Sequence, residues 1–104
     1  MILVRFVFQT KWGKAQQVVD SFKQDAEMMR RIVGPNMRSR LLTDLSGPFH
    51  TVVQEIEVAS LAEWERIRSA VFSNPEFQQS QASTEALIES GRTEFYTIEA
   101  TLTT

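Results

Sequence analysis

The sequence contains no cysteine and only one histidine, His50. The absence of cysteine excludes disulfides, thiolate metal ligands and cysteine nucleophiles. One histidine, without a second histidine or a glutamate at a metal-ligand spacing, does not make a metal site either. We therefore expect no metal and no bound cofactor, and we expect His50 to be a structural or partly exposed residue near a turn.

Clusters of one charge and long apolar runs are also missing. The formal net charge is −2, and the lysines and arginines are scattered, whereas phosphate binding needs them clustered. The apolar start, residues 1–8, is interrupted by Arg5 and is too short for a signal peptide, and no run is long enough to span a membrane. The composition predicts a cytoplasmic protein with no nucleic-acid partner and no membrane partner.

The remaining composition is that of an ordinary globular protein, with 104 residues of which 42% are hydrophobic and 23% charged. A chain of this length supports one hydrophobic core. We expect residues 1–104 to form a single domain.

Apolar periodicity divides the chain into strands and helices. Gly34 predicts the end of the first helix, and Ser60 with Glu63 forms a capping box that begins the second. Pro75 predicts a break in that second helix. The expected segments are a strand at 2–9, a helix from 14 to 33, a hairpin of two strands at 37–58, a broken helix at 60–90 and a strand at 93–102.

This order is typical of the ferredoxin-like βαββαβ fold of the α+β class. It predicts a four-stranded antiparallel sheet in the order 4-1-3-2, counted from the N-terminus, with both helices on one face. In the last strand, we expect Tyr96 under the helices and Phe95 on the opposite face.

The hairpin is expected to turn tightly at Ser46-Gly47-Pro48, with Gly47 and Pro48 as the two loop residues. A slip of one residue would mix the two faces, so the side chains themselves select this register. The expected pairs are Arg40 with Glu55, Arg38 with Glu57, Leu42 with Val53, Ser39 with Ile56 and Thr43 with Val52.

The sheet face away from the helices is the informative one. It combines large hydrophobic side chains, which would form an exposed patch, with charges that a dry core would not tolerate. We expect a homodimer in which two such faces pack together; the alternative is a monomer with a solvated Arg–Glu face. The expected members are Leu3, Arg5, Val7, Arg38, Arg40, Leu42, Phe49, Val53, Glu55, Glu57, Phe95, Thr97 and Glu99.

The order of segments resembles the dimeric α+β barrel superfamily over the whole chain. Residues 52–55, followed by Ser-Leu-Ala-Glu-Trp at 60–64 and Ser-Asn-Pro-Glu-Phe at 73–77, are similar to its NIPSNAP-like members. The small single-domain antibiotic-biosynthesis-monooxygenase-like proteins belong to the same group. This resemblance implies the barrel fold. The superfamily includes cofactor-free monooxygenases, haem-degrading enzymes, lactone isomerases and members without an assigned reaction, so the fold alone does not imply one activity.

Haem degradation in that superfamily relies on an early asparagine, a tryptophan in the second helix region and a histidine after it. Trp64 suits the second role, but Gln9 ends the first strand and residues 75–91 contain no histidine. We therefore reject haem degradation and expect Trp64 to be a core residue.

The candidate substrate-binding residues all come from the face away from the helices. One hypothesis is that an arginine there holds an anionic or carbonyl oxygen while a glutamate of raised pKa moves a proton. The other is a structural ladder of cross-strand pairs, each contributing roughly 0.2–1 kcal/mol. The candidates are Arg5, Arg38, Arg40, Glu55, Glu57, Phe95 and Glu99.

Three functions remain open. The favoured one is a homodimer that binds a small apolar or aromatic metabolite in a polar-lined central hollow, with cofactor-free monooxygenase or isomerase activity left undecided. The second is a structural or regulatory dimer without a ligand. The third is a subunit that docks a larger protein through the first helix.

Overall fold

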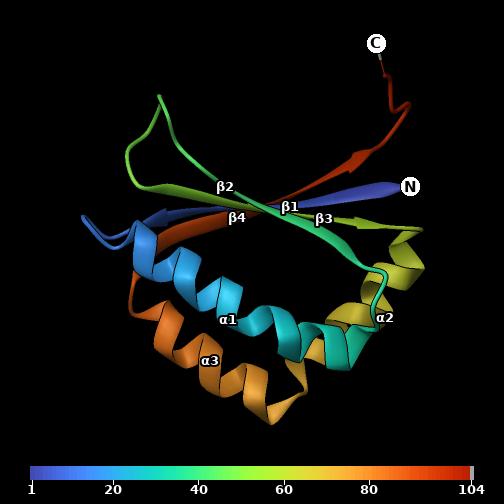
Figure 1. Cartoon of the computed structure of the whole chain (residues 1–104), viewed down its shortest axis with the longest axis horizontal. Helices are drawn as coiled ribbons and strands as arrows, with labels where there is room; N and C mark the ends of the chain where they lie inside the picture. Colours follow the sequence, from blue (N-terminus) through green and yellow to red (C-terminus); the bar gives the residue numbers. More distant parts are fainter. Residues whose placement is uncertain (104) are drawn as a thin grey trace.

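A computed structural model describes residues 1–103 and shows a four-stranded antiparallel sheet with all three helices on one face (Figure 1). The element order agrees with the expected ferredoxin-like fold. The elements are β1 (Ile2–Thr10), α1 (Ala15–Val33), β2 (Arg38–Thr43), β3 (Thr51–Val58), α2 (Leu61–Phe72), α3 (Pro75–Glu85) and β4 (Ile88–Thr97).

The sheet order is β2-β3-β1-β4, which is the predicted order read from the other edge. The predicted hairpin register is confirmed, with Arg40 opposite Glu55 and Leu42 opposite Val53. In β1, Val4 pairs with Ile56 of β3 and both are buried. Because side chains alternate along a strand, this register fixes which residues of every strand face the helices.

The core lies between the sheet and the helices. Val4, Ile56 and Val58 of the sheet pack against Trp64, Ile67 and Val71 of α2, and all six are buried. The expected core position of Trp64 is confirmed. Burial of such apolar side chains is the main term that holds the helices on this face.

The helix ends follow the local signals. Gly34, at φ 110°, caps α1 with its N–H donated to the carbonyl of Arg30. Ser60 Oγ accepts from Glu63 N at 3.1 Å, and Asn74 Oδ1 accepts from Glu76 N at 2.9 Å, so α2 and α3 begin at separate caps. The expected break near Pro75 therefore divides the second helical segment into two helices.

The predicted tight turn at Gly47-Pro48 is wrong. Strand pairing stops at Thr43 and resumes at Thr51, so residues 44–50 form a wider loop with the same register. Asp44 replaces a strand contact because its Oδ1 accepts from Thr51 N at 3.0 Å, and His50 adopts a φ of 57°. A side-chain hydrogen bond of this kind competes with ladder pairing.

The last strand also differs from the prediction, because β4 begins at Ile88 and not at residue 93. Gly91, expected to end a helix, lies inside β4 opposite Phe8, and a Cβ there would come within 3.0 Å of Phe8 Cδ1. A glycine can mark close packing in a strand as well as a helix end.

The register of β4 reverses the predicted faces of its side chains. Phe95 pairs with the core residue Val4 and lies on the helix side, whereas Tyr96 pairs with Leu3 and lies on the other face. Glu99 lies beyond the end of β4 at Thr97.

On the face without helices, two segments rise above the sheet. The hairpin loop lies at one end and the segment after β4 at the other, so this face forms a shallow saddle (Figure 1). Within residues 1–103, no helix is long and apolar enough to cross a membrane.

Candidate functional site

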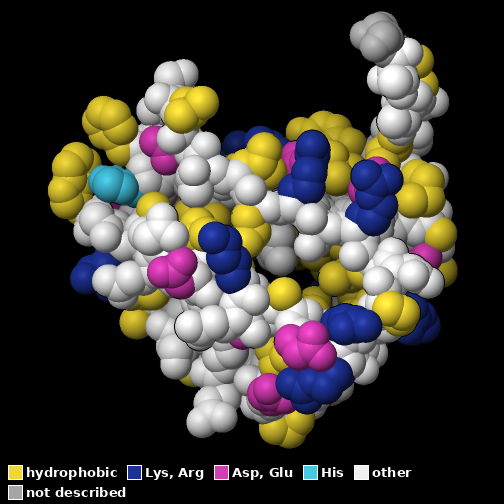
Figure 2. All heavy atoms as spheres, viewed as in Figure 1, with side chains coloured by type: hydrophobic (Ala, Val, Ile, Leu, Met, Phe, Trp, Pro, Cys, Tyr) yellow, Lys and Arg dark blue, Asp and Glu magenta, His cyan; other side chains and the backbone are white. Residues whose placement is uncertain are grey.

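A cavity of about 1020 Å³ lies between the sheet and the helices. Phe6 and Phe8 of β1 line it from the sheet, and Phe22 and Met29 of α1 and Trp64 of α2 line it from the helices. Figure 2 shows the molecule hollowed at this place, between the sheet and the helical layer.

Several aromatic rings belong to the apolar lining of the cavity. The Phe6 and Trp64 ring centroids are 5.7 Å apart, and those of Phe8 and Phe22 are 5.5 Å apart. Phe95, on the helix side of β4, lies 6.3 Å from Trp64. Rings in tilted and edge-on contacts leave planar surfaces against which a flat ligand can stack.

One polar side chain, Gln54 of β3, comes from the middle of the sheet. It pairs with Phe6 on one side and Leu41 on the other, and all three line the cavity. Within residues 1–103, the Gln54 amide has no hydrogen-bond partner. Every buried side-chain nitrogen or oxygen atom in that range does have one, so the Gln54 amide is accessible to solvent. A free amide offers a ligand both donors and an acceptor.

Charged side chains lie at the margins of the cavity. Lys23 and Arg30 come from α1, Arg68 from α2 and Glu85 from α3, and each is exposed. Figure 2 shows basic side chains on both sides of the hollow. The cavity thus has an aromatic interior and a charged rim.

The opposite face of the sheet has a different character. A row of alternating charges runs from Arg40 on β2 through Glu55 on β3 and Arg5 on β1 to Glu94 and Arg92 on β4. Arg40 donates to Glu55, which also lies 3.4 Å from Arg5 Nε. Arg5 Nη1 donates to Glu94 Oε1 at 2.7 Å.

Each of the two carboxylate oxygens of Glu94 accepts a hydrogen bond from an arginine. Arg92 Nε donates to Oε2 at 2.9 Å, and this bond, together with the one from Arg5, lowers the pKa of Glu94 to about 2. The hydrogen bond to Glu94 raises the pKa of Arg5 above its ordinary value. Both groups therefore stay charged at neutral pH, and neither is suited to exchange protons.

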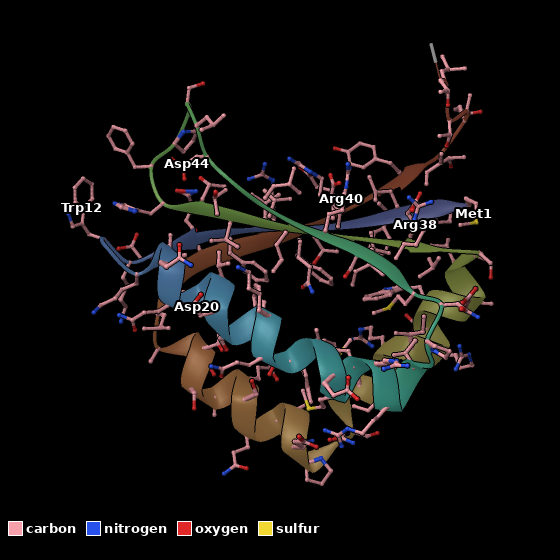
Figure 3. The ribbon with its side chains drawn as sticks, viewed as in Figure 1. Met1, Trp12, Asp20, Arg38, Arg40 and Asp44 are labelled. Atoms are coloured by element: carbon pink, nitrogen blue, oxygen red, sulfur yellow. The ribbon has the colours of Figure 1, made fainter. Side chains whose placement is uncertain are left out.

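The structure brings five of the seven predicted site residues together. Arg38, Arg40, Glu55 and Glu57 join Arg5 on the face away from the helices, where Arg38 Nε lies 3.4 Å from Glu57 Oε2. Figure 3 shows Arg38 and Arg40 on this side of the sheet. Their role in substrate binding stays a prediction.

The other two predicted site residues are elsewhere. Phe95 was expected on the charged face but lies on the helix side against Trp64, and Glu99 was expected in the last strand but follows it. Glu94 occupies the place in the charge row that sequence reasoning gave to Glu99. Its alternation with Arg92 and Tyr96 is visible in the sequence, but its place in the charge row depends on Gly91 lying inside β4.

His50 lies outside both regions. It is a loop residue beyond β2, and its ring centroid is 4.5 Å from that of Trp12, which is 76% exposed. Its carbonyl accepts from Thr10 N at 3.0 Å. His50 is thus a partly exposed structural residue, as expected. Within residues 1–103, no group of metal-ligating side chains comes together.

Known structures with the same fold were found over nearly the whole chain. A NIPSNAP domain protein from Burkholderia xenovorans superimposes with a TM-score of 0.83 at 15% identity and covers 100% of both chains. The chain has the fold of the dimeric α+β barrels. A NIPSNAP family protein from Agrobacterium tumefaciens matches this barrel fold with a TM-score of 0.80 at 20% identity, covering 92% of this chain and 90% of the other.

The barrel fold is also shared with SnoaB from Streptomyces nogalater, described as a cofactor-independent oxygenase. That match has a TM-score of 0.71 at 18% identity and covers 97% of this chain and 95% of SnoaB. Comparison with protein-family models and with curated protein sequences gives no match. The expected resemblance to NIPSNAP and monooxygenase-like proteins is therefore confirmed at the level of the fold.

Proposed function

We propose that this protein binds a small, flat, apolar or aromatic molecule in the cavity between the sheet and the helices. The observation that carries the proposal is the aromatic lining of a space of about 1020 Å³ by Phe6, Phe8, Phe22 and Trp64. Ligand sites are typically concave, mostly apolar and of about 300–1,000 Å³. At about 1020 Å³, this cavity is just above that range.

The location replaces the central hollow between subunits that the sequence suggested. The charged face presents Arg–Glu pairs that already satisfy one another, and Glu94 has a pKa of about 2. A ligand there would have to displace these pairs. On the helix side, Gln54 is free to orient a carbonyl or hydroxyl group of the ligand.

The amide of Gln54 can donate and accept hydrogen bonds, but it cannot take a proton in catalysis. This supports a binding function over acid–base chemistry at the middle of the cavity. The same fold in SnoaB belongs to a cofactor-independent oxygenase, which supports oxygenase activity only by analogy of fold.

The proposal includes a homodimer that forms through the charged face. Leu42 is 39% exposed and Tyr96 50% exposed there. A second copy would cover this face symmetrically, and the shared fold with dimeric barrels supports the arrangement. Each protomer would then keep its own cavity, on the outer side of its sheet.

The two tryptophans provide a direct test. Trp64 lines the cavity, whereas Trp12 is exposed in the loop after β1. We would titrate the neutral probe phenylnaphthylamine into Trp12→Phe and Trp64→Phe proteins and measure energy transfer from tryptophan to the probe. Saturable binding is expected in both, because a phenyl ring keeps the stacking surface.

Transfer should be more efficient in Trp12→Phe, whose remaining tryptophan is in the cavity, than in Trp64→Phe. Absence of saturable binding would overturn the proposed function. The reverse pattern of transfer would place the ligand at the exposed loop instead.

A further inference from the structure

The rim of the cavity is basic on the side between α1 and β2. Lys23 and Arg30 stand two helical turns apart, roughly 10 Å along the axis, and both line the cavity. Ala26 lies between them, and its short side chain leaves the rim open. Ser39 of the edge strand β2 also lines the cavity.

These two charges are weakly neutralised. Within residues 1–103, Lys23 has no ion-pair partner, and Arg30 has only Glu27, at 3.8 Å between side chains that are 66% and 68% exposed. Arg31, on another face of the same helix, instead makes two hydrogen bonds with Glu76, the shorter at 3.0 Å. The free positive charge of α1 is therefore directed to the cavity rim.

The opposite side of the cavity is balanced. Glu85 and Glu89 line it there together with Arg68 and Arg92, and the guanidinium of Arg68 lies over the Phe72 ring at 5.4 Å. The remaining acid of the lining, Asp25, belongs to α1 itself, and its carboxylate accepts hydrogen bonds from Ser80 Oγ of α3 at 2.7 and 2.9 Å. The charge asymmetry singles out the side between α1 and β2.

We infer that the ligand is an amphipathic anion: its rings lie among the aromatic side chains, and its carboxylate or similar anionic group lies between Lys23 and Arg30. This inference rests on the proposed function and names the class of molecule that the same cavity would take. Two cations near one anionic group would hold it by charge-assisted hydrogen bonds. The protein as a whole carries a charge of −2, so attraction must come from this local pair.

A pair of matched probes tests the inference. Phenylnaphthylamine is neutral, and anilinonaphthalenesulfonate has the same rings with an added sulfonate. The interactions of the sulfonate with Lys23 and with Arg30, both partly exposed, should together raise the affinity by a factor of about ten. We expect the sulfonate probe to bind the wild-type protein about tenfold more tightly than the neutral one.

The double variant K23Q/R30Q should lose this advantage and bind the neutral probe within about twofold of wild type. The control variant K14Q/R66Q removes the same charge from exposed positions that do not line the cavity. It should leave both affinities within about twofold, because distant surface charges are screened by salt.

Equal binding of the two probes to wild type would overturn the inference while leaving the proposed function intact. Equal weakening of the sulfonate probe by both double variants would overturn it too, because the effect would then follow net charge and not the rim. If the neutral probe does not bind, the proposed function itself fails.

Discussion

The two faces of one sheet carry opposite chemistry. On the helix side, Phe6 and Phe8 of β1 leave an aromatic cavity beneath the helices. On the other side, Arg5 of the same strand lies between Glu55 and Glu94 in a row of alternating charges. Successive side chains of a strand point to opposite faces, so the nine residues of β1 contribute alternately to one surface and to the other.

The difference separates two tasks. The helix side has space, planar apolar surface and an unpaired amide, which are the features of a ligand site. On the charged side the arginines and glutamates of the charge row are paired with one another, which suits contact with a second copy of the chain. A ligand site and a subunit interface can thus lie on opposite faces of one small sheet, with Arg92 of β4 at the border of both.

The largest expected contrast is in stability. Ile67 lies under the sheet and is 2% exposed. Changing it to alanine should lower the free energy of unfolding by about 2–5 kcal/mol. Leu42→Ala, on the charged face, should cost less than about 1 kcal/mol at protein concentrations low enough to dissociate a dimer. Urea unfolding of both variants measures the contrast, and equal losses would contradict it.

A smaller effect is expected at the centre of the charge row. Arg5→Leu removes a partner from both Glu55 and Glu94 and should lower the free energy of unfolding by about 1–2 kcal/mol. The loss should shrink as salt is added, because it is electrostatic. Arg66→Leu, at an exposed position without an ion pair in residues 1–103, serves as the control and should change little.

The smallest effect concerns pH. Folding lowers the pKa of Glu94 to about 2, so its stabilising contribution is complete above its unfolded pKa of about 4.3 and is lost as pH falls towards 2. Glu94→Gln should therefore be less stable than wild type at about pH 6 but nearly equal to it at about pH 2. Denaturant unfolding across this range gives the difference; a constant difference would show that Glu94 does not contribute through its charge.

Much of the fold was predictable because its signals are local. Gly34 ends α1, Ser60 and Asn74 begin α2 and α3, and the arginines of β2 face glutamates of β3 at one register only. These features depend on backbone freedom, side-chain caps and cross-strand charge. They need no knowledge of the rest of the chain.

The errors came from tertiary contacts. Gly91 has the sequence signature of a helix end, but it lies in β4 because the Phe8 ring packs over it. In this register of β4, Phe95 lies on the helix side and Glu94 lies beside Arg5. The alternation placed Phe6 and Phe8 towards the helices, but the space left beneath those helices depends on how they cross the sheet.

The central claim, that each protomer has its own ligand cavity on the helix side, is tested most directly by counting ligands. Native mass spectrometry of the protein saturated with phenylnaphthylamine should show a species of twice 11.9 kDa carrying two probe molecules. A dimer that carries a single probe molecule would contradict the account, because it would place the ligand between the two charged faces.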